Sequence, residues 1–261
     1  MLFRQLFDPE TSTYTYLLAD RATREAVLID SVREQFERDS TLMRELDLKL
    51  LYTLETHVHA DHVTGSGKLR AELGSAVVVS AAGGVSNADI ELVDGDTLSF
   101  GSHTLEARAT PGHTSGCMTF VLHEEGMAFT GDTLLIRGCG RTDFQEGSAR
   151  TLYASVQNRI LSLAPDTLLY PGHDYKGRTV TSVAEEQLFN ARLGSGKSEE
   201  DFVTIMDGLK LAYPKKIDEA VPANLESGLL TPAAAEPASS VAGMMEDLGR
   251  QDAELLLGAG I

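Results

Sequence analysis

The sequence predicts an α/β protein in which helices cover two sheets, in the order of a four-layer αβ/βα sandwich. Short apolar runs rich in β-branched residues alternate with segments whose apolar residues recur at helical spacing, and this strand–helix format is repeated over two halves of the chain. Gly or Pro-Gly stands at the end of several apolar runs, where a strand must turn sharply into a loop. Polar residues cluster directly after these turns, which is where layered α/β proteins usually carry their sites.

The start of the chain is expected to hold three short strands and a helix. The strands are residues 2–6, 14–18 and 26–29, and turns rich in Asp and Thr separate them. Two hairpins at the start of a chain favour an antiparallel edge on a mixed sheet. Residues 32–46 carry apolar residues at helical spacing and a charged opposite face, which predicts an amphipathic helix.

The middle of the chain is expected to be mostly strand. A helix is predicted at residues 63–73, and residues 80–96 are expected to form a loop. The predicted strands are residues 48–54, 76–80, 97–100, 103–108 and 118–122.

The last third is expected to be mostly helical. Residues 168–170 form a short strand, and residues 214–218 are expected to be a linker that returns the chain to the domain. The predicted helices are residues 149–163, 180–193 and 198–211.

The composition changes at residue 226, which predicts one domain over residues 1–225 and an acidic extension over residues 226–261. Residues 231–240 have the Pro, Ala and Ser content of a linker. Residues 241–257 have two interpretations, an unstructured tail or a short amphipathic helix that docks on another subunit.

Charge and hydropathy exclude several classes of partner. The formal net charge of −17 over 261 residues disfavours nucleic acid and anionic membranes. No apolar run approaches the length of about 18–20 residues that a membrane-spanning helix needs. The N-terminal residues show no targeting pattern, so a cytoplasmic location is expected. The two cysteines, Cys117 and Cys139, are expected to be small core residues, with redox sensitivity as the alternative for Cys139.

The most informative stretch is Thr-His-Val-His-Ala-Asp-His at residues 56–62, directly after the predicted strand 48–54. It places four possible metal ligands, His57, His59, Asp61 and His62, on one turn. Imidazole and carboxylate groups together suit zinc, iron, manganese or nickel. A helix with this spacing would point the side chains to different faces, whereas a turn can direct them to one place.

This pattern resembles the signature of the metallo-β-lactamase superfamily, and the resemblance implies a His, an Asp and a His on later loops. His113 follows Pro111-Gly112, Asp132 follows Gly131, and His173 follows Pro171-Gly172. The ligand set is therefore complete, and the resemblance implies the metallo-β-lactamase fold.

The ligand set leaves the reaction open. Two zinc ions would make a hydrolase that attacks a thioester or lactam carbonyl, whereas one iron held by two histidines and a carboxylate would leave room for a substrate and O₂. A third interpretation is a non-catalytic scaffold whose acidic tail recruits a partner.

Three other segments resemble the persulfide dioxygenase family, the sulfur dioxygenases of the ethylmalonic-encephalopathy type. They are residues 133–147, with Gly-Cys-Gly-Arg-Thr-Asp-Phe, residues 171–180 and residues 215–224. The glyoxalase II thioesterases are similar by motif, but they carry a Lys and two aromatic residues where this chain has Arg141, Thr142 and Asp143. They also end in a helical glutathione-binding domain that this C-terminus does not resemble.

The resemblance implies one Fe(II) per chain, bound by His57, His113 and Asp132. The reaction it implies is oxidation of glutathione persulfide by O₂ and water to sulfite and glutathione, in sulfide detoxification by a homodimer. The alternative is a dinuclear zinc glutathione thioesterase of the glyoxalase II kind. If one Fe(II) is bound, four ligand-type residues would lie near the metal without binding it, namely His59, Asp61, His62 and His173.

Four further residues are candidates for contact with the anionic substrate. Arg141 is expected to act near the metal, paired either with Asp143 or with a glutathione carboxylate. Tyr175, Lys176 and Arg178 follow His173 and make a local basic cluster on an acidic chain, with plain surface residues as the alternative reading. Arg141, Asp143 and Tyr175 are the predicted catalytic residues.

Overall fold

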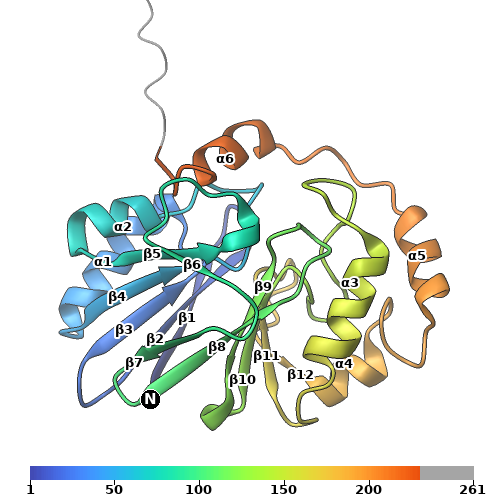
Figure 1. Cartoon of the computed structure of the whole chain (residues 1–261), viewed down its shortest axis with the longest axis horizontal. Helices are drawn as coiled ribbons and strands as arrows, with labels where there is room; N and C mark the ends of the chain where they lie inside the picture. Colours follow the sequence, from blue (N-terminus) through green and yellow to red (C-terminus); the bar gives the residue numbers. More distant parts are fainter. Residues whose placement is uncertain (230–261) are drawn as a thin grey trace, which may run out of the picture. The chain divides into compact units, whose positions relative to one another are not determined.

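The computed structural model describes residues 1–229, and its centre consists of two six-stranded sheets that pack face to face (Figure 1). The predicted linker at residues 231–240 and the segment 241–257 lie outside the described residues. Residues 226–229 pack with the rest: the Gly67 amide donates to the Ser227 carbonyl at 2.9 Å, and Arg33 donates to the Gly228 carbonyl at 2.6 Å.

The first sheet has the strand order β1–β2–β3–β4–β5–β6. Its first three strands run antiparallel, and β3 to β6 run parallel, so the predicted antiparallel edge on a mixed sheet is confirmed. The strands are β1 (Leu2–Asp8), β2 (Thr13–Ala19), β3 (Glu25–Ile29), β4 (Lys49–Leu54), β5 (Ala76–Ser80) and β6 (Ile90–Leu92).

The second sheet has the order β12–β11–β10–β9–β8–β7. Among the described strands of this sheet, β10 and β11 are the one parallel pair. Their carboxyl ends therefore lie at the same edge. The strands are β7 (Thr97–Phe100), β8 (His103–Ala109), β9 (Met118–Leu122), β10 (Met127–Gly131), β11 (Leu168–Pro171) and β12 (Thr181–Ser182).

Helices cover the outer face of each sheet and complete the predicted four layers (Figure 1). Buried side chains of α1 and α2 pack on the first sheet, and those of α3 and α5 pack on the second. The helices are α1 (Phe36–Glu45), α2 (Ser66–Leu73), α3 (Ala149–Ser155), which continues as a π-helical turn (Val156–Ile160), α4 (Val183–Phe189), α5 (Glu199–Asp207) and α6 (Ile217–Asn224).

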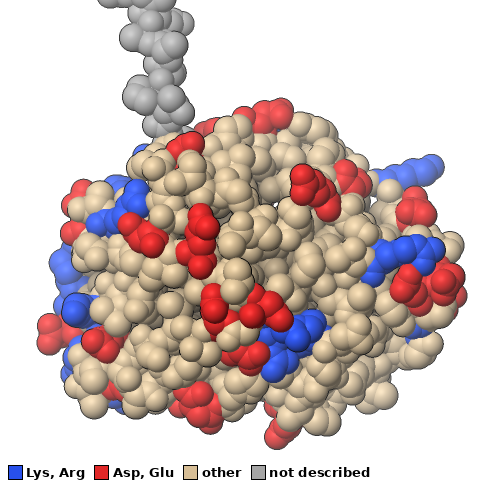
Figure 2. Space-filling view, in the orientation of Figure 1, with Lys and Arg blue, Asp and Glu red and all other residues tan. Residues whose placement is uncertain are grey.

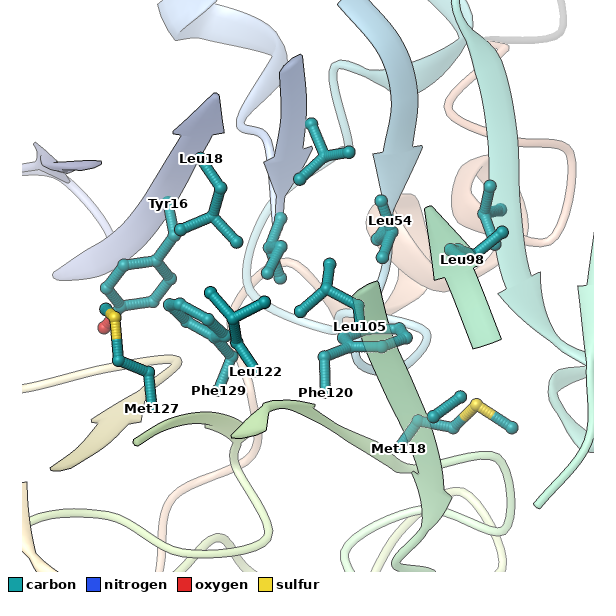
Figure 3. Close-up of a cluster of buried hydrophobic side chains, with 14 of the residues drawn as sticks. Tyr16, Leu18, Leu54, Leu98, Leu105, Met118, Phe120, Leu122, Met127 and Phe129 are labelled. Atoms are coloured by element: carbon teal, nitrogen blue, oxygen red, sulfur yellow. The ribbon is translucent and has the colours of Figure 1, made fainter. Parts of the chain in front are cut away.

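Large apolar side chains from both sheets fill the space between them (Figure 3). Tyr16 of β2, Phe129 of β10 and Tyr170 of β11 form an aromatic group, with ring centroids 5.0, 5.6 and 5.4 Å apart. The Tyr16 hydroxyl donates to the Pro171 carbonyl at 2.6 Å, which satisfies its polar end in the core. These contacts tie β10 and β11 to the first sheet and so set the ends of the strands that precede Asp132 and His173.

Two predicted helices begin later than expected because residues 32 and 64 pair with each other. Val32 and Thr64 form an isolated antiparallel bridge, and Val32 has an extended backbone. A 3₁₀ turn (Arg33–Gln35) precedes α1, and α2 begins only at Ser66. The pairing of Val32 with Thr64, rather than helix propensity, therefore determines where α1 and α2 begin.

Three further expectations need correction. The predicted loop at residues 80–96 contains a 3₁₀ turn (Ala81–Gly83) and β6, which is too short for its period to show in the sequence. The predicted helix at 180–193 is shorter, because β12 pairs with β11 before α4 begins. The predicted linker at 214–218 overlaps α6, whose Ala220 and Ala223 pack on Val63. That tertiary contact outweighs the Pro and Lys content that indicated a linker.

Replacing Phe129 tests the packing of the sheets. Phe129→Ala leaves a cavity beside Tyr16 and Tyr170, so the free energy of unfolding should fall by about 3–5 kcal/mol. Urea denaturation measures the loss. Leu188, which is 61% exposed on α4, is the control, and Leu188→Ala should cost about 0.5 kcal/mol or less. Similar losses in both variants would contradict this account of the core.

Candidate metal centre

Four loops at one edge of the sandwich carry the candidate ligands. His57 follows β4, His113 follows β8, Asp132 directly follows β10, and His173 follows β11. Gly131 makes this convergence possible: its φ is +50°, and a Cβ there would lie 2.4 Å from the Thr56 hydroxyl oxygen. Only glycine allows β10 to end so close to the loop that carries His57.

His57, His113 and Asp132 each direct one donor atom to a common point. These three atoms lie within 4.8 Å of one another. The Nε2 atom of His113 is 3.8 Å from Oδ2 of Asp132, and the rings of His57 and His113 are 4.9 Å apart between centroids. Two imidazole nitrogens and a carboxylate oxygen at this spacing suit a first-row transition metal.

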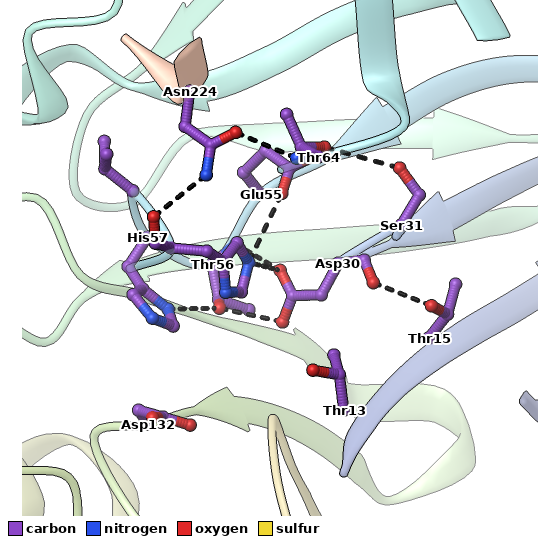
Figure 4. Close-up of polar contacts among 12 residues, drawn as sticks. Thr13, Thr15, Asp30, Ser31, Glu55, Thr56, His57, Thr64, Asp132 and Asn224 are labelled. Carbon is purple, nitrogen blue, oxygen red and sulfur yellow. Dashed lines mark hydrogen bonds and ion pairs between the residues drawn. The ribbon is translucent and has the colours of Figure 1, made fainter. Parts of the chain in front are cut away.

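A buried relay orients His57 (Figure 4). The Thr56 hydroxyl donates to Oδ2 of Asp30 at 2.8 Å, and Nδ1 of His57 lies 3.0 Å from that hydroxyl oxygen. Because the Thr56 hydroxyl directs its proton at Asp30, its oxygen can only accept from His57. Nδ1 of His57 is therefore the donor, and Nε2 keeps its lone pair for a metal. Burial, together with nearby His59 and His113, lowers the pKa of His57 well below its ordinary value, so the ring is neutral.

His113 is oriented by a backbone carbonyl. Its Nδ1 lies 2.6 Å from the carbonyl oxygen of Arg141, and a carbonyl can only accept. Nδ1 of His113 is therefore the donor, and Nε2 faces Asp132 with a free lone pair. Gly140 allows this approach, because a Cβ there would lie 2.7 Å from Nδ1 of His113.

His173 orients Asp132 from the other side. Its Nδ1 donates to Oδ1 of Asp132 at 2.7 Å, which leaves Oδ2 of Asp132 directed at the common point. Its Nε2 lies 2.9 Å from Oδ2 of Asp61. Burial alone would lower the pKa of His173, but the two carboxylates raise it well above its ordinary value. In the metal-free protein, His173 is therefore a cation between two anions.

The remaining ligand-type residues lie next to this group. His59, Asp61 and His62 have donor atoms within 4.8 Å of one another. Oδ2 of Asp61 receives Nδ1 of His62 at 3.0 Å, Nε2 of His173 at 2.9 Å and the Thr13 hydroxyl at 3.2 Å. This oxygen of Asp61 therefore has three hydrogen-bonding partners, whereas Nδ1 of His59 and Nε2 of His62 are buried and have none among the described residues.

His59 is held by two buried carboxylates. Its Nε2 is 3.2 Å from Oδ1 of Asp30 and 3.3 Å from Oε2 of Glu55. Burial opposes the charged ring, but these carboxylates raise the pKa of His59 to about 10.

The predicted substrate residues have different environments. The Arg141 guanidinium forms a bidentate pair with Asp143, at 2.6 and 2.7 Å, and donates to the Ala212 carbonyl at 2.8 Å. Arg178 donates to the buried Asp174 at 2.8 Å and to the Ile136 carbonyl at 2.7 Å, so its side chain shapes the loop after His173.

Tyr175 and Lys176 are exposed beside the centre. Tyr175 is 73% exposed, and its ring stacks on that of His173 at 6.0 Å between centroids. The Lys176 side chain is exposed as well, while its backbone amide donates to Asp174. Both side chains are accessible to a ligand that approaches from this side.

Sequence reasoning missed three residues that hold the centre together. Asp30, at the end of β3, bonds to the Thr56 amide, the Thr56 hydroxyl and His59. Glu55 accepts hydrogen bonds from the hydroxyls of Thr64 and Ser66. Asn224, the last residue of α6, bonds to the loop that carries the histidines. Asp30 could have been found in the sequence, because it is a polar residue directly after a buried strand. Asn224 has no sequence pattern that indicates its role.

The comparisons with known proteins agree with this geometry. A family model of the metallo-β-lactamase superfamily matches residues 8–173. The mitochondrial persulfide dioxygenase ETHE1 of Homo sapiens is 56% identical to the chain over 235 residues, which is 90% of this chain and 91% of that protein. The chain belongs to the persulfide dioxygenase family. A crystal structure of ETHE1 from Myxococcus xanthus is 52% identical and covers 88% of this chain and 100% of that one, with a TM-score of 0.85.

The thioesterase in these comparisons is less similar to the chain than the persulfide dioxygenases are. The hydroxyacylglutathione hydrolase of Rhizobium meliloti is 34% identical over 172 residues, 65% of each chain. The predicted metallo-β-lactamase fold and the predicted resemblance to persulfide dioxygenases are both confirmed.

Both cysteines are buried, as predicted for core residues. Burial raises the pKa of the Cys117 thiol and that of the Cys139 thiol to about 11, so neither is a thiolate at neutral pH. On the face drawn in Figure 2, acidic and basic side chains are interspersed. Among the described residues, no helix has the length and apolar character needed to cross a bilayer.

His113→Ala tests the ligand assignment. The substitution removes the nitrogen that faces Asp132, so the purified variant should lose most of its bound metal. Elemental analysis of the folded protein measures the loss. His123, whose side chain is 55% exposed and bonds to Glu106, is the control, and His123→Ala should keep its metal. Full metal content in His113→Ala would show that the assigned ligand set is wrong.

Proposed function

We propose that the chain is a persulfide dioxygenase that binds one Fe(II) through His57, His113 and Asp132. Its reaction is the oxidation of glutathione persulfide by O₂ and water to sulfite and glutathione. The observation that carries this proposal is the set of three donor atoms within 4.8 Å, two from histidine and one from aspartate, in a member of the persulfide dioxygenase family. Two histidines and one carboxylate on one side of the metal are the donor set of non-haem Fe(II) oxygenases.

Hydrogen bonding supports one metal rather than two. The Oδ2 atom of Asp61 has three partners, and both nitrogens of His173 face carboxylates. A second metal that bound Oδ2 of Asp61 or a nitrogen of His173 would have to displace these bonds in a buried site, where each broken bond leaves a polar group unsatisfied. The residues of a second site are therefore used to orient Asp132 and the loop of His57.

The protein residues in this proposal position the reactants. Iron held by His57, His113 and Asp132 would supply the redox chemistry and the open coordination sites that the persulfide and O₂ need. The sulfur gains two oxygen atoms from O₂ and one from water, its bond to the glutathione sulfur breaks, and four electrons pass from the sulfur to O₂. Fixing both reactants at one place turns a bimolecular encounter into a local one.

The substrate contacts that we propose lie on the side of His173. Tyr175 and Lys176 are exposed there, and the Lys176 ammonium can meet a glutathione carboxylate. The Arg141 guanidinium can meet the other carboxylate by exchanging its pair with Asp143, and both residues are part of the proposed catalytic group. Arg178 acts in this proposal through Asp174, by fixing the loop that carries Tyr175.

Assembly and location stay predictions. A homodimer is expected from the family resemblance, and a cytoplasmic location is expected from the sequence. The name of the human relative places that protein in mitochondria. The predicted lack of nucleic-acid and membrane partners rests on the net charge of −17.

The dinuclear zinc thioesterase is the second candidate, because the fold brings all seven ligand-type residues of the superfamily pattern to the ends of neighbouring strands. It would bind two metals and hydrolyse S-lactoylglutathione without O₂.

Metal content and O₂ uptake on one purified sample decide between the two. We expect about one iron per chain, and O₂ consumption that starts only when glutathione persulfide is added. Sulfite should form in equal amount to the O₂ consumed. Two zinc ions per chain, hydrolysis of S-lactoylglutathione and no O₂ uptake would establish the thioesterase instead.

Asp61→Asn separates the candidates independently. The amide keeps an oxygen that can accept from His173, so a mononuclear enzyme should retain its iron and lose no more than about tenfold in kcat/KM. A dinuclear hydrolase would lose a charged ligand of the second metal and nearly all activity. Loss of all activity with normal iron content would instead point to a direct catalytic role for the Asp61 carboxylate.

A further inference from the structure

Asn224 lies 160 residues beyond Thr64, the last residue of the loop 56–64, which we call the histidine loop. Its side chain makes three hydrogen bonds to this loop, and Figure 4 shows the bond to Thr64. Its Nδ2 donates to the carbonyl of His59 at 2.9 Å and to the carbonyl of His62 at 2.8 Å. Its Oδ1 accepts from the amide of Thr64 at 2.8 Å. The side chain is buried, and one amide group thus satisfies three backbone groups that the turn leaves without partners.

The rest of α6 is packed on the same loop. Ala220 and Ala223 contact Val63, and Val221 and Leu225 pack against the cluster that contains Val58. Beyond the helix, Gly228 has a φ of +76°, and a Cβ there would lie 2.3 Å from the Thr64 carbonyl oxygen. The chain therefore approaches the loop closely along the whole of residues 220–228, and Asn224 is the polar contact at the centre.

A continuous series of bonds leads from Asn224 to a proposed metal ligand. The two carbonyls that Asn224 holds belong to His59 and His62, on either side of Asp61. Asp61 lies 2.9 Å from Nε2 of His173, and Nδ1 of His173 lies 2.7 Å from Oδ1 of Asp132. The position of the loop end thus sets the position of Asp61, and Asp61 with His173 sets the rotation of Asp132.

We propose that Asn224 is a positioning residue for the metal centre: it fixes the end of the histidine loop and, through Asp61 and His173, the orientation of Asp132. Asp30 fixes the start of the same loop through Thr56, so the loop is held at both ends by buried polar side chains from distant parts of the chain. The proposal rests on the ligand assignment made above, but not on the identity of the persulfide.

The test is metal binding by the metal-free protein, with Co²⁺ as the probe and its visible absorption as the signal. Asn224→Ser removes the amide without adding a charge, and Asn224→Asp keeps the shape but turns a carboxylate oxygen towards two carbonyls. Both variants should bind Co²⁺ at least tenfold more weakly than the parent, with a changed absorption spectrum. Thermal unfolding of the metal-free proteins reports any general loss of stability.

Asn190 supplies the matched control. It is equally buried, and its amide bonds to Gly138, Glu186, Arg192 and Leu193, none of which is a proposed ligand. Asn190→Ala should lower the unfolding temperature and leave the Kd for Co²⁺ within twofold of the parent. If Asn224→Ser lowers the unfolding temperature by as much but also leaves the Kd within twofold, Asn224 only stabilises the fold and the proposal is overturned.

A double substitution tests the route to Asp132. Asp61→Ala breaks the contact with His173, so adding Asn224→Ser to it should weaken Co²⁺ binding by less than a further twofold. Effects that multiply would overturn the proposed route. Absence of Co²⁺ binding in the parent would count against the metal site itself, and hence against the proposed function, whereas normal binding in the parent isolates the role of Asn224.

Discussion

The structure of the metal centre depends on the buried carboxylate of Asp30. Burying a carboxylate is costly unless its oxygens are hydrogen-bonded, and Asp30 takes the Thr56 amide, the Thr56 hydroxyl and Nε2 of His59. These bonds dictate which nitrogen of His57 is free, and they fix the first turn of the loop after β4. The parallel pairing of β3 with β4 brings Asp30 to this place, so the sheet topology determines the chemistry of the site.

The four layers and the ligand group could be predicted because their signals are local. Strand and helix periods are visible within a few residues, and His57, His113, Asp132 and His173 each stand directly after a strand and a turn. Parallel strands that end at one edge then bring such residues together without further information. The segment around Arg141 identified the persulfide dioxygenase family, and the comparisons confirm that prediction.

The residues that hold the ligands were not predictable in the same way, because their role exists only in three dimensions. Glu55 looks like one more polar residue before the histidine motif, yet it accepts from Thr64 and Ser66 and faces His59. Residues 214–218 have a linker composition, yet α6 begins among them and delivers Asn224 to the loop. In both cases the contact that gives the residue its role joins two segments, and the sequence of one segment does not indicate the other.

The residue types at the site suit one metal or two, so hydrogen bonding is the property that can distinguish the two cases. All seven ligand-type residues are present, but a carboxylate that already accepts three donors and a histidine held between two carboxylates are poor metal ligands. A second metal that used these atoms would have to replace those bonds inside a buried site, while Nδ1 of His59 and Nε2 of His62 have no hydrogen-bond partner among the described residues. His173 and Asp61 hold Oδ1 of Asp132 on one side, so the hydrogen bonds that occupy these two residues also direct Oδ2 of Asp132 towards His113.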